Sequence, residues 1–246
     1  TLKALIINQT VLPNQIVVVN GGGEKNCQKT LEKWGQVFSN LLIIKTNNKN
    51  LAASRNIGIP HCSSDIILQT DDDARPYPDW VEKNIKMHEK YERAGVIGGS
   101  VIDSDGLSLL SQIADVSTFP KFKEIIEVRN VPGVNSSYKR AVINQVGEYD
   151  ENLFRGEDVD YNWRAIRKGW KVLHIPELKV IHVHRPTWRG LFYQHFMYGC
   201  AYYLVRKKWP QMYCLYPHSM DSFKNIINLL YFFVVPFIDG FKKALK

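Results

Sequence analysis

The chain has 246 residues, enough to bury a substantial core in one large α/β domain with or without a smaller appendage. Its formal net charge of +8 favours an anionic partner, such as a nucleotide diphosphate or an anionic lipid surface. Nucleic acid is not among the expected partners, because no nucleic-acid-binding motif accompanies the charge. The four cysteines form no C-x-x-C pair and are too sparse for a disulfide-stapled domain, so free buried thiols in a reducing compartment are expected.

Short β-branched runs recur in the first part of the chain, at residues 16–19, 41–44, 66–68 and 96–101. The segments between these runs are long enough for crossover helices. This alternation predicts the α/β class, with a mostly parallel, Rossmann-like sheet covered on both faces. One of the helices is expected to begin near Pro78, to carry Trp80, Met87 and Tyr91 on one face, and to stop at Gly95.

The second part of the chain has a different character. It is expected to contain a loop at residues 131–137, a helix at 157–168 that Gly169 ends, and two short strands at 172–175 and 179–183. The spacing of Val159, Trp163 and Ile166 predicts one buried face of that helix. Aromatic and basic residues become frequent after residue 186, so we expect a catalytic domain over residues 1–186 and a helical segment over residues 187–246.

Three carboxylates, Asp71, Asp72 and Asp73, directly follow the apolar run at residues 66–68. They are therefore expected at the carboxyl end of a strand, which is where open α/β sheets bind their ligands. Alternate carboxylates on one short stretch can converge on a single point, and their hard oxygen atoms suit Mg²⁺ or Mn²⁺ held jointly with a substrate diphosphate. The alternative interpretation is a solvated acidic turn that caps the next helix.

A second acidic cluster, Glu157, Asp158 and Asp160, falls in the first turn of the expected 157–168 helix. The amide-rich end of a helix stabilises a carboxylate over a carboxylic acid, so Asp158 is expected to be ionised at neutral pH, as a general base must be. Simple helix capping is the alternative. Later in the chain, a neutral His182 or His184 is either a nitrogen ligand of the metal or a polar residue without that role.

Five segments resemble family 2 of the glycosyltransferases in their order and spacing. They read N-N-K-N-L-A-A-S-R-N-I-G, T-D-D-D-A-R-P-Y-P-D-W, V-P-G-V-N-S-S-Y-K-R, V-G-E-Y-D-E-N-L-F-R-G-E-D-V-D-Y-N-W-R and I-P-E-L-K-V-I-H-V-H-R. The resemblance covers residues 16–185. It implies an A-type glycosyltransferase fold, a nucleotide-sugar donor, a divalent metal and inversion at the anomeric carbon.

The resemblance also implies roles for individual residues. Asp158 matches the catalytic base, and the metal side is matched by Asp71, Asp73 and His182, with His184 as the second choice for the histidine. The residues expected to bind donor or acceptor are Asn20, Arg55, Asp71, Asn135, Ser136, Glu157 and Arg164. Among these, Arg55 matches a basic residue near the donor phosphates, and the 135–136 pair matches a loop that lines the sugar and acceptor pocket.

The chain departs from the family pattern in two places. The family usually opens with a strand that carries the nucleotide base, whereas this chain starts inside what resembles the following helix, at residues 1–5. The first strand is therefore expected to be missing. The second strand of the family usually ends in two aspartates that help to hold the base, and Asn20 and Gly21 stand there instead.

The end of the chain combines an apolar core with lysines. Residues 229–235 are uninterruptedly apolar, a run far shorter than the roughly 20 residues that a membrane-spanning helix needs. An in-plane helix on a membrane surface fits residues 223–246 better, because aromatic residues suit the headgroup boundary and lysines suit anionic lipids; a buried helix is the alternative. Since residues 1–9 show no signal peptide, we expect a cytoplasmic protein at the inner face of the membrane.

Three functions from different classes remain open. The leading one is metal-dependent transfer of a sugar from a nucleotide-sugar donor to a hydroxyl of a glycan or lipid-linked acceptor, in polysaccharide or glycolipid synthesis. The second is nucleotidyl or phosphoryl transfer, which needs two bridged metal ions. The third is a non-catalytic nucleotide- or glycan-binding module, which the missing first strand and Asn20 favour.

Overall fold

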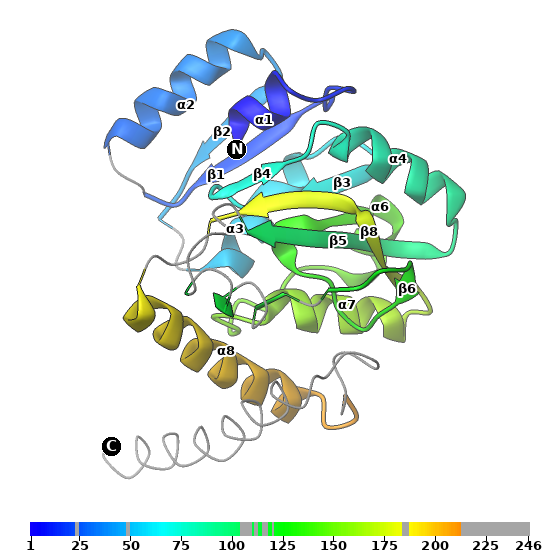
Figure 1. Cartoon of the computed structure of the whole chain (residues 1–246). Coiled ribbons are helices and arrows are strands. Elements are labelled where there is room, and N and C mark those ends of the chain that lie inside the picture. The colour runs from blue at the N-terminus through cyan, green and yellow to red at the C-terminus, as the bar shows by residue number, and fades with distance from the viewer. Residues whose placement is uncertain are drawn as a thin grey trace.

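The computed structural model describes residues 1–22, 25–47, 50–103, 110, 113–114, 118–119, 121–183 and 187–212. Strands gather in the centre of the molecule and helices lie on both sides of them (Figure 1). The predicted α/β class is therefore confirmed.

The first part of the chain contains all four strands that the β-branched runs predicted. In order, the elements are α1 (Leu2–Ile6), β1 (Ile16–Asn20), α2 (Lys25–Val37), β2 (Leu41–Lys45), α3 (Leu51–Gly58), η1 (Ile59–His61), β3 (Ile66–Gln69), β4 (Ala74–Pro76), α4 (Trp80–Lys90) and β5 (Ala94–Asp103). Each predicted strand is longer than its β-branched run, because residues beyond the run continue the hydrogen-bond ladder. The helix expected at the start of the chain is α1.

The second part of the chain contains β6 (Ile126–Glu127), η2 (Gly133–Asn135), β7 (Ser136–Lys139), α6 (Arg140–Val146), α7 (Glu157–Arg167), β8 (Lys171–His182) and α8 (Trp188–Lys208). The loop predicted at residues 131–137 is partly regular structure, since a 3₁₀ turn and the start of a strand fall within it. Of the segment 187–246 that was expected to be helical, α8 confirms a helix for residues 188–208. Residues 213–246 lie outside the described residues, and they include the segment 223–246 to which a membrane contact was assigned.

The strands of the described residues form two sheets. The smaller one is the parallel pair β1–β2, and the larger one has the order β3-β7-β5-β8-β4, with β6 also on β8. Within the larger sheet β5 and β8 run parallel, whereas the other pairs are antiparallel. The prediction of a mostly parallel sheet is therefore wrong for this larger sheet. The strands β4, β6 and β7, which all pair antiparallel, are short and lack a long apolar run, so the sequence pattern did not reveal them.

The two strands predicted at residues 172–175 and 179–183 form the single strand β8. Gly99 of β5 pairs with Ile175, and the next residue, Ser100, pairs with Lys179, so residues 176–178 bulge out of the ladder. Pro176 lies in this bulge, where its missing N–H costs no ladder hydrogen bond. The proline interrupts the apolar pattern without ending the strand.

Helix α4 begins as predicted but ends at Lys90 rather than at Gly95. Tyr91 is the C-cap residue, and its N–H donates to the carbonyl of Met87 at 2.9 Å. Gly95 lies inside β5, where a side chain would not fit because an added Cβ would lie 2.5 Å from Val142 Cγ2. This glycine therefore serves sheet packing and not helix termination.

Helix α7 matches the predicted boundaries within one residue but buries a different face. Tyr161 and Ala165 are fully buried against the sheet, whereas the predicted Val159, Trp163 and Ile166 are only partly buried. Val159 and Trp163 pack in a small cluster that α8 shares. The face prediction fails because α7 lies between the sheet and a second helix.

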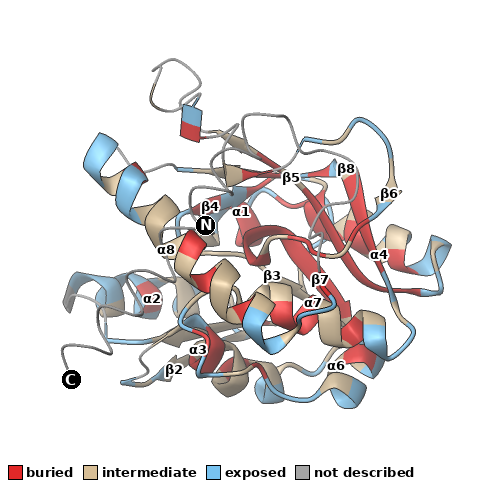
Figure 2. Ribbon diagram, turned by 90° about the horizontal axis from the view of Figure 1, so that it is seen from below, coloured by how far each residue is buried: buried red, intermediate tan, exposed pale blue. Residues whose placement is uncertain are grey.

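The core occupies both faces of β5 and β8. Neighbouring residues on β5 point to opposite sides, since Val96 packs with Tyr161 of α7 and Ile97 packs with Met87 of α4. Figure 2 shows these two strands as the most continuously buried part of the molecule. A rigid pair of buried strands therefore supports whatever lies at their ends.

Two further sequence expectations concern surfaces. Within the described residues no helix combines the length and the apolar character needed to cross a membrane. Cys27 is exposed and Cys62 and Cys200 are partly exposed, so the expectation of buried thiols is wrong for the described cysteines.

Candidate active site

The two acidic clusters meet at the carboxyl ends of β5 and β8. The turn 71–73 connects β3 to β4, and the antiparallel pairing of Ala74 with His182 places that turn beside the last residue of β8. The carboxylates of Asp73 and Asp158 both act electrostatically on Asp71. Segments that are far apart in the sequence therefore share one electrostatic environment.

Asp73 and His182 form a pair at the rim of this site. Asp73 Oδ1 lies 3.5 Å from His182 Nε2, and the side chains are 52% and 12% exposed, respectively. The ring of Phe119 packs edge-on against the imidazole, with the ring centroids 5.6 Å apart. Because His184 lies outside the described residues, His182 is the histidine that the structure places beside the acids.

Asp71 is half-buried in the same turn. Burial is the main reason why the pKa of its carboxyl rises to about 6; Arg55 opposes this shift, and the neighbouring carboxylates of Asp73 and Asp158 add to it. A carboxyl in this state exchanges its proton readily near neutral pH and is stabilised in its charged form by any added cation. Asp71 is thus suited to a site that binds a cation.

Asp158, at the start of α7, accepts hydrogen bonds from two backbone N–H groups. Its Oδ2 accepts from Gly133 at 3.0 Å and its Oδ1 accepts from Val159 at 2.8 Å. Burial, followed by the charge of Glu157, nevertheless raises the pKa of Asp158 to about 6, against the opposing effects of Arg55 and of the two N–H groups. The expectation of an ionised carboxylate at neutral pH holds, but its pKa shifts upward because desolvation outweighs the helix end.

Arg55 of α3 supplies the cation of the site. Its guanidinium pairs with Glu157, both side chains are largely buried, and the Tyr149 ring lies 5.3 Å from the guanidinium carbon. Gly133 makes room for this arrangement, because an added Cβ there would lie 2.3 Å from Arg55 Nη2. Arg55 and Glu157 therefore support Asp158, and their direct contact with a substrate stays a prediction.

Asn135 and Ser136 are buried, and hydrogen bonds to the protein occupy their side chains. Asn135 Nδ2 donates to carbonyls of β5 and β8 at 3.0 and 2.9 Å, and its Oδ1 accepts from Trp80 Nε1 at 2.8 Å. Ser136 Oγ donates to the carbonyl of Gly133 at 3.3 Å. These contacts fix the η2 turn, and a direct contact of either residue with substrate stays a prediction.

Arg164 and Asn20 also make internal contacts. Arg164 Nε donates to Asp160 Oδ2 at 2.9 Å, and its other nitrogens donate to two carbonyls of the 146–148 segment. Asn20, at the end of β1, donates to Gln28 Oε1 at 3.2 Å. Both residues therefore have structural partners, and their substrate roles stay predictions.

Two residues of the site were missed by sequence reasoning: Gly133 and Tyr149. Gly133 follows Pro132, and this Pro-Gly pair is a local turn signal that could have identified it. Tyr149 stacks on Tyr161 with ring centroids 4.0 Å apart, a contact that no local pattern reveals.

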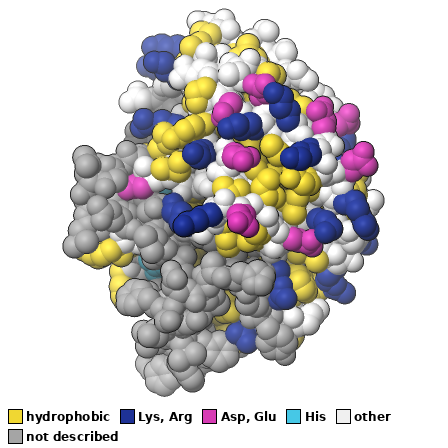
Figure 3. Space-filling model, turned by 45° about the vertical axis from the view of Figure 1, so that its right-hand side comes forward, with side chains coloured by type: hydrophobic (Ala, Val, Ile, Leu, Met, Phe, Trp, Pro, Cys, Tyr) yellow, Lys and Arg dark blue, Asp and Glu magenta, His cyan; other side chains and the backbone are white. Residues whose placement is uncertain are grey.

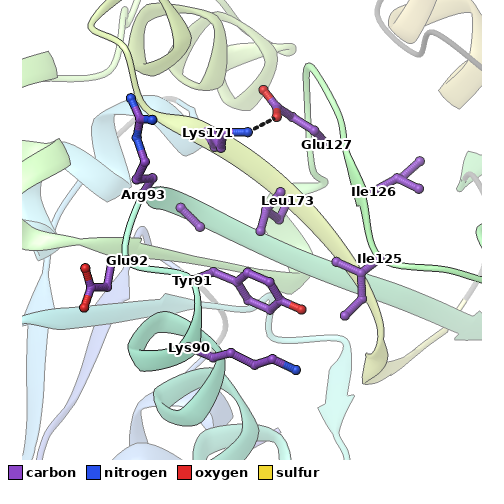
Figure 4. A pocket seen from close by; sticks show the side chains of 10 residues that line it. Lys90, Tyr91, Glu92, Arg93, Ile125, Ile126, Glu127, Lys171 and Leu173 are labelled. Carbon is purple, nitrogen blue, oxygen red and sulfur yellow. Dashed lines mark hydrogen bonds and ion pairs between the residues drawn. The ribbon is translucent and has the colours of Figure 1, made fainter.

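A pocket lies at the opposite, amino-terminal ends of β5 and β8 (Figure 4). Ala94 and Lys171, which form part of its lining, are the first paired residues of these strands, whereas Asp103 and His182 are the last. Lys171 there pairs with Glu127 at 2.7 Å. On the face drawn in Figure 3, cations and anions are likewise interspersed, so the net positive charge is not gathered into one basic patch on that face.

Solved structures define the class to which this fold belongs. A mannosyltransferase from Pyrobaculum calidifontis, in complex with GDP-Man and Mn²⁺, has a TM-score of 0.65 at 15% identity, over 94% of this chain and 66% of that one. S. aureus TarS 1-349, in complex with UDP, has a TM-score of 0.61 at 14% identity, over 94% of this chain and 65% of that one. The fold is that of an A-type glycosyltransferase.

The sequence comparison then identifies the family. The family model described as "Glycosyl transferase family 2" matches residues 2–147 of this chain. The chain therefore belongs to that family. It is 29% identical to the glucosyl-dolichyl phosphate glucuronosyltransferase of Haloferax volcanii in an alignment of 163 positions that covers 62% of this chain and 51% of that protein. The chain thus spans about half the length of this curated relative.

Proposed function

We propose that the chain transfers a sugar from a nucleotide-sugar donor to an acceptor hydroxyl with inversion at the anomeric carbon. The observation that carries this proposal is the meeting of Asp71 and Asp158, both with a pKa of about 6, beside the Asp73–His182 pair. One side of the site thus offers metal ligands and the other offers a proton acceptor. Membership of glycosyl transferase family 2 supports the same reaction class.

The donor set fits a divalent cation that is shared with a substrate. Asp73 offers a carboxylate oxygen and His182 a ring nitrogen, with Asp71 in the same turn, and Mg²⁺ and Mn²⁺ accept such ligands. Within the described residues no three such side chains are close enough to hold an ion by themselves, so the diphosphate must supply further oxygen atoms. When bound, the ion would neutralise charge on the departing diphosphate.

Asp158 is the residue suited to accept the proton of the acceptor hydroxyl. Its pKa of about 6 leaves it mostly ionised at pH 7 and brings its basicity nearer to the working pH than that of an ordinary aspartate. The two N–H groups that hold its oxygens fix its direction. Turnover is therefore expected to fall as the pH drops through about 6, when Asp158 becomes protonated.

The acceptor that we propose is a glycan or a lipid-linked substrate used in polysaccharide or glycolipid synthesis. Relatives named glucosyl-dolichyl phosphate glucuronosyltransferase and O-antigen chain rhamnosyltransferase support this class of acceptor. We further propose that residues 223–246 contact the inner face of the membrane and bring the site to such an acceptor. Loss of binding to anionic liposomes on deletion of residues 222–246 would support this, and unchanged binding would contradict it.

Release of nucleoside diphosphate tests the function and separates the alternatives. The protein is incubated with a panel of nucleotide sugars, with Mn²⁺ or with chelator, and the diphosphate is quantified. Transfer or slow hydrolysis of one donor, dependent on Mn²⁺, supports the proposal. Release of pyrophosphate or of a nucleoside monophosphate would indicate nucleotidyl or phosphoryl transfer, and binding of a donor without any cleavage would indicate a binding module.

A further inference from the structure

Helix α8 lies against the beginning of α7, close to the proposed base. A Cβ added at Gly156 would lie 3.1 Å from Val205 Cγ2 and 3.4 Å from the Ala201 Cβ, so the helix approaches the backbone just before Asp158 as closely as a glycine allows. Gly156 also has a φ of +77°, a conformation that favours glycine. The middle of α8 is therefore one wall of the site.

The carboxyl-terminal end of α8 is anchored to α7. Asp160 Oδ1 accepts from Trp209 Nε1 at 2.7 Å, and Lys208 Nζ lies 2.8 Å from the same oxygen. Lys208 also reaches Asp150 Oδ2 at 2.6 Å. Because Asp160 is completely buried, these contacts hold α8 in one position relative to the base.

Tyr198 lies three residues before Ala201 and seven before Val205, so it is on the face of α8 that packs against Gly156. The guanidinium of Arg155 lies 5.4 Å from its ring centroid, and Gln194 Nε2 donates to its hydroxyl oxygen at 2.8 Å. Within the described part of the chain this is the one hydrogen bond of the hydroxyl, which keeps its own proton to donate. Burial raises the pKa of Tyr198, and the carboxylates of Asp158 and, to a smaller extent, Asp71 raise it as well.

We propose that Tyr198 binds the acceptor, by donating a hydrogen bond to an acceptor oxygen next to the hydroxyl that Asp158 deprotonates. The base touches the acceptor, whereas Asp73 and His182 face the donor diphosphate in the proposed function, on which this inference rests. Tyr198 lies on the helix that packs at the base. Gln194 and Arg155 orient the phenol of this half-buried residue.

The variant Tyr198→Phe tests this assignment, because it removes the hydroxyl and keeps the ring that Arg155 contacts. Octyl glucoside and a polyprenyl phosphate serve as acceptor probes, with the donor that the diphosphate-release panel selects. The KM for the acceptor should rise about 3- to 10-fold, as expected for one lost hydrogen bond, while the donor KM and the hydrolysis rate without acceptor stay within about twofold. Tyr193→Phe, at a 61% exposed position of the same helix, should change neither KM.

A second variant separates orientation from folding. Gln194→Leu should shift the acceptor KM in the same direction, and the double variant should be no worse than Tyr198→Phe alone, because both changes remove one hydrogen-bonded unit. An unchanged acceptor KM, a raised donor KM, or donor hydrolysis without transfer to either probe by the unmodified protein would overturn the acceptor site. Absence of any diphosphate release by the unmodified protein would instead overturn the proposed function itself.

Discussion

Gly133 and Asp158 form the link between the η2 turn and the proposed base: the Gly133 N–H donates to Asp158 Oδ2 at 3.0 Å. The same glycine has no side chain where the Arg55 guanidinium passes, and an added Cβ would lie 2.3 Å from Arg55 Nη2. Gly133 therefore holds the proposed base, Asp158, by a hydrogen bond. It also leaves room for the Arg55 guanidinium, whose positive charge offsets the nearby carboxylates. The geometry of the site depends on a residue that takes no part in the chemistry.

Gly133→Ala should damage both stability and turnover. The added methyl displaces Arg55 from Glu157 or shifts the turn away from Asp158, and overpacking of this kind costs about 1–3 kcal/mol in the free energy of unfolding. Urea denaturation measures the loss. Gly35→Ala is the matched control, since nothing lies within 4 Å of a Cβ there and the change from glycine inside α2 should stabilise by up to about 1 kcal/mol. Equal effects of the two changes would contradict the packing role of Gly133.

Asp158→Asn should preserve donor binding and lower turnover by roughly 10²-fold or more, because a general base contributes about that much. The amide oxygen can still accept from Gly133, so the turn should keep its position. Calorimetry with the nucleotide sugar measures binding, and diphosphate release with acceptor measures turnover. Near-normal turnover would move the base to another residue.

The same variant should be more stable than the unmodified protein at neutral pH. The pKa of Asp158 is about 6 in the folded state and about 3.9 in the unfolded state, so folding favours the protonated form. Its stabilising contribution is present below about pH 4 and is lost as the pH rises through about 6. Asp158→Asn should therefore gain on the order of 1–3 kcal/mol at pH 7.5 and little near pH 4.

Thermal unfolding of both proteins from pH 4 to 8, without ligand, measures this difference. The buried His88 and His174, whose pKa values burial lowers to about 4, oppose the trend because they destabilise the fold at low pH, but they are common to both proteins. Only the difference between the two curves isolates Asp158. A gap that does not widen with rising pH would show that the Asp158 carboxyl is not desolvated.

Asp73→Ala should abolish the part of donor binding that depends on Mn²⁺, because the carboxylate of the Asp73–His182 pair is lost. His182→Ala should act in the same direction. Calorimetry with the nucleotide sugar, with and without Mn²⁺, measures the effect. Asp72→Ala, an exposed aspartate of the same turn, is the control and should retain the metal dependence. Unchanged affinity in Asp73→Ala would remove this residue from the metal site.

Asp160→Ala should destabilise the protein by about 3 kcal/mol, because it leaves the partly buried Arg164 and Lys208 without their shared, fully buried partner. Urea denaturation measures the free energy of unfolding. Glu127→Ala is the matched control, since the Glu127–Lys171 pair is about half exposed and such pairs contribute about 0–1 kcal/mol. Similar losses in the two variants would show that Asp160 does not anchor α8.

The sequence alone determined the features that depend on local pattern. The strands at residues 16–19, 41–44, 66–68 and 96–101 were predicted because β-branched runs mark the buried centres of strands, and α7 was predicted because apolar residues at helical spacing precede Gly169, which ends the helix. The chemical identity of the two acidic clusters and the family were likewise readable, since both follow from residue types in a fixed order.

Only the tertiary structure decided what depends on contacts between distant segments. The antiparallel pairing of β4 with β8 brings Asp73 close to His182. The sequence of the three-residue strand Ala74–Pro76 contains no pattern that predicts this pairing. The upward pKa of Asp158 arises because packing removes water from a carboxylate that its helix position would favour as charged. Tyr198 lies under the Arg155 guanidinium because α8 packs against the start of α7. Desolvation and long-range packing exist only in the folded chain. The direction of the Asp158 pKa shift therefore could not be read from the order of residues alone.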